Sequence, residues 1–80
     1  MDDVTKRLIK CFQVVFPGLP ESQVPAASQE ALESWDSVAT VTLANVVEEE
    51  FSIPMDFDRL AELNSFETVR EWVLTETRTA

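Results

Sequence analysis

Residues 35–51 read WDSVATVTLANVVEEEF, and this stretch decides the fold that we expect. Asp36 is a favourable N-cap, because its carboxylate accepts a hydrogen bond from an unpaired N–H in the first helical turn. Apolar residues then recur near one face of a helix, with the last two widening the stripe: Val38, Val41, Val47, Phe51, Leu43 and Val46. The valines and threonines lower helix propensity, so a β-strand over 38–43 is the alternative. Residues 45–51 favour helix, which Ser52-Ile53-Pro54 ends.

A second amphipathic helix is predicted before this stretch, from Asp2 to Phe16. Its apolar residues recur at spacings of three and four: Val4, Leu8, Cys11, Phe12 and Val15. Asp2 and Asp3 suit the positive N-terminal end of a helix, and Pro17-Gly18 stops it.

Residues 17–34 form a long connection that is rich in proline. A loop of this length in a small domain is usually functional or is held down by its own apolar side chains. The candidates for that anchoring are Leu19, Val24 and Leu32. A short helical turn is also expected around Gln29 to Glu33.

After Pro54 we expect a short helix over Phe57 to Leu63, capped by Asp56, and then a last helix capped by Asn64 or Ser65. The last helix should turn four residues inward: Phe66, Val69, Trp72 and Val73. Its tail from Thr75 to Ala80 should fray. The prediction is therefore all-α: one domain over 1–80, an up-and-down four-helix bundle with three longer helices and a short third one.

Composition narrows the possible functions. The 80 residues carry 15 acids and 6 bases, a net charge of −9. Nucleic acids and anionic membrane surfaces should repel this chain, whereas a partner rich in Lys and Arg should attract it. No apolar run approaches the ~20 residues of a membrane span, and the N-terminus lacks the apolar core of a signal peptide.

Side chains suited to catalysis are scarce. The sequence has no histidine, which removes the commonest general base and metal ligand. Cys11 is the only cysteine, so an internal disulfide is excluded and a reducing, cytoplasmic location is expected. Cys11 lies among apolar residues and is interpreted as a small buried hydrophobe. We therefore expect no enzymatic activity.

Residues 35–73 resemble the acyl carrier proteins. The family opens its second helix with Asp-Ser-Leu and ends it with Glu-Glu-Glu-Phe, and here these motifs are Asp36-Ser37-Val38 and residues 48–51, followed by Ile53-Pro54. The resemblance implies a monomeric bundle of acyl-carrier type. It also implies that a phosphopantetheinyl transferase moves 4'-phosphopantetheine from coenzyme A onto the Ser37 hydroxyl, with Asp36 helping recognition. The thiol of the arm would then carry acyl groups as thioesters.

The resemblance also implies a surface for partner enzymes. Val38 and Val41 occupy the family's positions for small exposed apolar contacts beside the arm, with core packing as the alternative interpretation. An acidic rim would meet basic patches on acyl-loading and acyl-transfer enzymes: Glu48, Glu49, Asp56, Asp58 and Glu62. The plainer interpretation of this rim is a solvated face.

Three departures from the family pattern point to a specialised pathway, such as polyketide or modified-lipid synthesis, rather than core fatty acid synthesis. Ala39 and Thr42 stand where acids are usual, and Asn45 stands where a large hydrophobe is common. Residues 57–59 are slightly similar to D-alanyl carrier proteins, which are an alternative within the superfamily. The Gly-Gly-x-Ser pattern of peptidyl carriers is missing.

Other classes remain open on the residues alone. Asp56, Asp58 and Glu67 match three ligand positions of an EF-hand, but Leu60 and Ala61 stand where an oxygen ligand and a glycine are needed. A cofactor-free acidic adaptor fits the composition equally well, and Asp-Ser alone is ordinary helix-capping chemistry.

Overall fold

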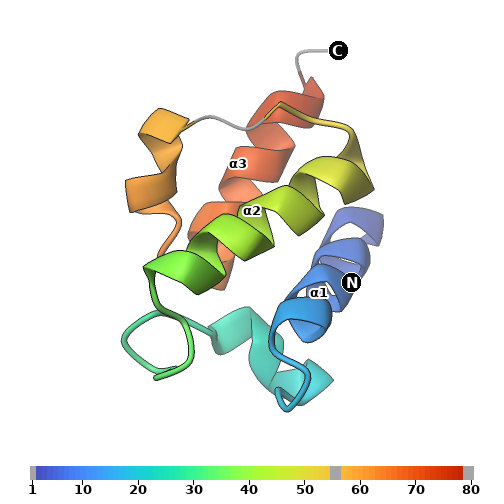
Figure 1. Cartoon of the computed structure of the whole chain (residues 1–80). Coiled ribbons are helices and arrows are strands. Elements are labelled where there is room, and N and C mark those ends of the chain that lie inside the picture. Colours follow the sequence, from blue (N-terminus) through green and yellow to red (C-terminus); the bar gives the residue numbers. More distant parts are fainter. Residues whose placement is uncertain (1, 55–56, 79–80) are drawn as a thin grey trace.

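The computed structural model describes residues 2–54 and 57–78, and these residues form an all-α fold (Figure 1). The elements are α1 (Asp3–Val15), the 3₁₀-helix η1 (Glu21–Ala26), α2 (Ser37–Phe51), the 3₁₀-helix η2 (Phe57–Glu62) and α3 (Phe66–Arg78). The only β-type pairing in the described part of the chain is an isolated bridge between Ser28 and Ser65. No helix among the described residues has the length and apolar character needed to cross a membrane. The all-α prediction is confirmed.

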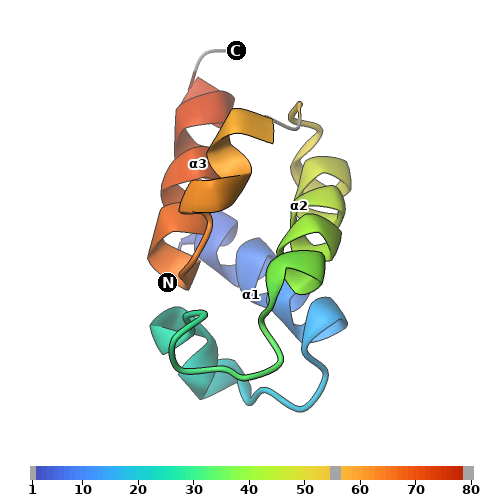
Figure 2. The same cartoon turned by 60° about the vertical axis from the view of Figure 1, so that its left-hand side comes forward.

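The long connection closes one end of the helical assembly. Figures 1 and 2 show residues 17–36 and η1 below the three α-helices, at the end where α2 and α3 begin, with the C-terminus at the opposite end. Two backbone bonds join the connection to the start of α3: Gln29 donates to the Asn64 carbonyl at 2.8 Å, and Phe66 donates to the Ala27 carbonyl at 2.9 Å. The start of α2 is therefore held between a tethered loop and the core.

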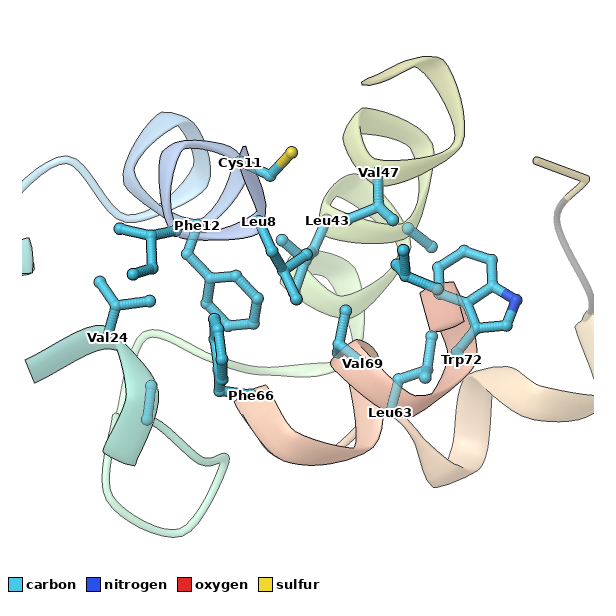
Figure 3. Packing of buried hydrophobic residues seen from close by; sticks show 14 of the residues in the cluster. Leu8, Cys11, Phe12, Val24, Leu43, Val47, Leu63, Phe66, Val69 and Trp72 are labelled. Carbon is cyan, nitrogen blue, oxygen red and sulfur yellow. The ribbon is translucent and has the colours of Figure 1, made fainter. Parts of the chain in front are cut away.

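Every helix except η2 contributes buried side chains to the core (Figure 3). The largest fully buried side chains are Trp72, Phe12, Leu8, Leu43, Val24, Val47, Val69 and Val73. Phe12 lies at an aromatic junction, with its ring centroid 5.4 Å from that of Trp35, 5.1 Å from that of Phe66 and 6.3 Å from that of Phe16. This ring links α1 to the connection and to α3.

The N-terminal end of α1 is fixed by polar contacts of Asp2. The Asp2 carboxylate caps α1 by accepting from the Thr5 N–H at 2.8 Å, and Arg70 donates to the same carboxylate at 3.2 Å. Hydrogen bonds from Thr5, followed by the charge of Arg70, lower the pKa of Asp2 from 3.8 to about 2. The first helix is thereby tied to α3.

The C-terminal end of α2 carries three successive glutamates, where the helix dipole disfavours negative charge. Arg7 offsets this by donating to the Glu50 carboxylate at 2.7 Å and to the Glu50 carbonyl at 2.6 Å, with its guanidinium 4.5 Å from the centre of the Phe51 ring. Ser52 then ends the helix in the left-handed region, at φ 54° and ψ 45°.

The observed elements differ from the expectations in three places. The long connection contains the 3₁₀-helix η1, which was not predicted; its i→i+3 geometry accommodates Pro25, and Val24 within it is completely buried. The short turn expected around Gln29 to Glu33 is present over residues 29–31, where the Leu32 N–H donates to the Ser28 carbonyl at 2.9 Å. The strand alternative over 38–43 is wrong, because this segment is helical. The helix α3 continues through Arg78, into the tail expected to fray.

The buried face of α2 also differs from the predicted stripe. The residues that point inward are spaced by three or four positions: Thr40, Leu43, Ala44, Val47 and Phe51. Val38 and Val41 lie outside this face and are exposed, so assigning them to the apolar stripe was wrong. A threonine takes the first core position of the helix instead.

Candidate functional site

Ser37 is the first residue of α2 and is exposed. Asp36 is the N-cap, with extended backbone at φ −100° and ψ −172°, and its carboxylate accepts from the Ala39 N–H at 2.8 Å. The predicted cap and helix start are confirmed. The chain therefore presents a serine hydroxyl to solvent at the open end of a fifteen-residue helix.

The amides beside Ser37 are available to an anion. Within the described residues, no group accepts a hydrogen bond from the backbone N–H of Ser37 or Val38, because the Asp36 side chain takes the amide of Ala39 and the Asp36 carbonyl takes that of Thr40. The first turn of α2 also carries no acidic residue. A phosphodiester on the Ser37 oxygen would thus meet unpaired donors and the positive end of the helix dipole. The residues present fit that group.

The segment before Ser37 is anchored by Trp35. This side chain is buried, and its ring lies 5.4 Å from that of Phe12 and 5.7 Å from that of Phe16, measured between centroids. Trp35 points into the core while Ser37, two residues later, remains at the surface. The exposure of the serine is therefore set by a large buried anchor.

Thr40 connects three parts of the chain at one atom. Its Oγ1 accepts from the Trp35 indole N–H at 2.9 Å and from the Gln29 carboxamide at 3.0 Å, and it donates to the Asp36 carbonyl at 3.1 Å. Thr40 is only 4% exposed and is the one buried polar residue recorded for the described chain. This network was not predicted from the sequence. The sequence did contain an indication, because Thr40 lies three and four residues before Leu43 and Ala44, on the buried face of α2.

Apolar side chains are exposed near the serine. Val38 is 73% exposed and Val41 is 41% exposed, both in the first half of α2. A shallow hollow of about 370 Å³ lies between this part of α2 and η2, lined by Gln29, Ser37, Thr40, Val41, Leu60 and Ala61. Phe57, at the start of η2, is 74% exposed and was not singled out from the sequence.

The acids of the predicted rim lie on α2 and η2. Glu48 and Glu49 lie near the C-terminal end of α2, where Glu48 is half-buried and Glu49 is exposed. Asp58 and Glu62 are exposed on η2, which lines the same hollow as Ser37. Asp56, which was predicted both as a rim residue and as a helix cap, lies outside the described residues. The acid adjacent to the serine in sequence is the N-cap Asp36.

The groups most often used to activate a serine are scarce around Ser37. The sequence has no histidine, and the adjacent Asp36 carboxylate accepts from the Ala39 N–H at 2.8 Å. Cys11 is buried on α1, and burial raises the pKa of its thiol to about 11, which suppresses the reactive thiolate. Residues 2–54 and 57–78 hold no cluster of His, Cys, Asp or Glu able to bind a metal ion.

Comparisons with protein-family models, with curated proteins and with solved structures give no match for this chain.

Proposed function

We propose that this protein is a carrier that holds acyl groups as thioesters on a 4'-phosphopantetheine arm attached to Ser37. The observation that carries the proposal is the exposed hydroxyl at the capped N-terminus of α2, beside the unpaired amides of Ser37 and Val38. An all-α assembly with a long connection before that helix agrees with a bundle of acyl-carrier type.

The loading step would be a phosphoryl transfer catalysed by a separate transferase. The Ser37 oxygen attacks the pantetheine-side phosphorus of coenzyme A, the bond between the two phosphates breaks, and adenosine 3',5'-bisphosphate leaves. The hydroxyl proton passes to a base on the transferase, since this chain has no histidine and its cysteine is buried. The arm, once attached, supplies a terminal thiol for thioester exchange.

The surface around Ser37 supports a specialised pathway. The exposed residues in the first half of α2 are all uncharged: Ser37, Val38, Val41, Thr42 and Asn45. Beyond the N-cap carboxylate of Asp36, a partner enzyme would therefore meet an apolar and neutral surface on this half of α2, with further acids toward Phe51 and on η2. This distribution favours partners that differ from those of core fatty acid synthesis.

The test is to incubate the protein with coenzyme A, Mg²⁺ and a promiscuous phosphopantetheinyl transferase, and to measure the intact mass. We expect one added arm on the wild type and none on Ser37→Ala. Ser34→Ala is the matched control, because Ser34 is exposed three residues upstream and should leave loading unchanged. A folded wild type that gains no mass, in a reaction that loads a known carrier, would reject the proposal in favour of a cofactor-free adaptor.

A further inference from the structure

We propose that Thr40 is a positioning residue, whose buried hydroxyl holds the Asp36–Ser37 segment in the conformation that a transferase esterifies. The inference rests on the proposed function and adds to it a specific requirement inside the carrier itself. It begins from the three hydrogen bonds that meet at Thr40 Oγ1, from Trp35, from Gln29 and to the Asp36 carbonyl.

These bonds use the full capacity of the hydroxyl. A threonine hydroxyl has one donor and two acceptor positions, and all three are occupied by different segments of the chain. Gln29 belongs to the long connection, Trp35 is the core anchor, and Asp36 is the helix cap. The orientation of the hydroxyl is therefore fixed from three directions.

Asp36, the residue before Ser37, is restrained through both its backbone carbonyl and its side-chain carboxylate. The Asp36 carbonyl accepts from the Thr40 N–H at 3.0 Å and from the Thr40 hydroxyl at 3.1 Å, while the Asp36 carboxylate accepts from the Ala39 N–H at 2.8 Å. The peptide that joins Asp36 to Ser37 has little rotational freedom left. We infer that this restraint keeps the serine oxygen aimed at solvent before any partner binds.

A matched control lies near the C-terminal end of α3, away from the surface around Ser37. Thr77 Oγ1 donates to the Val73 carbonyl at 2.9 Å, the same type of bond to residue i−4 that Thr40 makes to Asp36. Thr77 is exposed and lies on a different helix from the hydrogen bonds of Thr40. Thr77→Val therefore removes an equivalent helical bond without disturbing the network.

The experiment measures kcat and KM for the carrier, with the transferase at saturating coenzyme A, for wild type, Thr40→Val, Thr40→Ser and Thr77→Val. Misplacement of the reacting oxygen should lower kcat of Thr40→Val by about tenfold or more. Its KM should change little, because the exposed docking side chains are untouched. Thr40→Ser, which retains the hydroxyl, should recover most of the rate, and Thr77→Val should match the wild type.

The division between kcat and KM separates positioning from a purely structural role. If Thr40→Val were merely less stable, its unfolded fraction would raise the apparent KM and leave kcat unchanged. The indole N–H resonance of Trp35 in a ¹H–¹⁵N spectrum provides a second readout. This resonance should move in Thr40→Val, return in Thr40→Ser and stay in place in Thr77→Val.

The inference would be overturned if folded Thr40→Val had the wild-type kcat, or if Thr77→Val lost as much kcat as Thr40→Val. If Thr40→Val does not fold, Trp35→Phe is tested in its place, because phenylalanine keeps an aromatic ring in the core and removes the indole donor. An unchanged kcat in Trp35→Phe would again overturn the inference. A wild type that accepts no arm is a different result, since it rejects the proposed function and this inference with it.

Discussion

Phe12 offers the sharpest test of the core. Its side chain is fully buried, and its ring touches those of Phe16, Trp35 and Phe66 with centroids 5.1–6.3 Å apart. Truncation to alanine would cost ~3–5 kcal/mol. The whole stability expected of 80 residues is about 4–12 kcal/mol. Alanine could therefore unfold the protein, so leucine is the better substitution.

Leucine keeps most of the buried volume but loses the ring contacts. Each aromatic pair contributes ~0.5–1.5 kcal/mol beyond its area, and three pairs that share one ring do not add fully. Together with a small residual cavity, we expect Phe12→Leu to lower the free energy of unfolding by about 2 kcal/mol. For a domain of this size, that corresponds to a fall in Tm of roughly 8–16 °C.

The assay is urea denaturation followed by far-UV circular dichroism, with the slope m compared between variants to confirm that the denatured state is unchanged. Phe57→Leu is the matched control, because Phe57 is largely exposed and the same substitution there should change stability by less than ~0.5 kcal/mol. A loss in Phe12→Leu no larger than in Phe57→Leu would refute the idea that this aromatic junction holds α1 against the connection and α3.

Two further predictions concern the helix ends. Ser52→Gly should raise the free energy of unfolding by about 0.5–1 kcal/mol in the same urea assay. Ser52 has φ 54°, and glycine adopts this conformation without a Cβ clash. An unchanged free energy of unfolding would show that the strain of the left-handed conformation is compensated locally. Asp2→Asn should lower stability at neutral pH, since the folded-state pKa of Asp2 is depressed to about 2 from 3.8. Stability from a depressed carboxyl pKa is present above the unfolded value and lost as pH falls through the folded one, so the wild-type advantage in thermal unfolding should shrink between about pH 4 and pH 2. An advantage that is the same at pH 2 and pH 6 would contradict this assignment.

Helices with both a periodic apolar face and a cap were predictable from sequence. Asp36 marked the start of α2, and Phe66, Val69, Trp72 and Val73 marked the inner face of α3, where the Ser65 hydroxyl accepts from the Thr68 N–H at 3.2 Å. Local chemistry decides such features, because a cap and its amide lie within one helical turn. The position of Ser37 followed from the same local chemistry.

The long connection was less predictable for a physical reason. The sequence placed Val24 among the anchoring residues but did not predict the 3₁₀-helix around Pro25 in which Val24 is fully buried. Its path depends on long-range bonds, such as that from the Gln29 amide to the Asn64 carbonyl, which no local periodicity encodes. The role of Thr40 was hidden for the same reason, since its partner Gln29 is eleven residues away in the sequence.

In the proposed carrier, the distribution of charge along α2 separates the encounter with a partner from the presentation of the hydroxyl. Glu48 is eleven residues beyond Ser37, which at ~1.5 Å per residue is about 16 Å along the helix. Exposed charges are largely screened beyond ~8 Å at physiological ionic strength. The glutamates would therefore guide the approach of a basic partner and contribute little at the serine itself. Close fit there would depend on Val38 and Val41, and on the rigid link through Thr40 that sets where the Ser37 oxygen points.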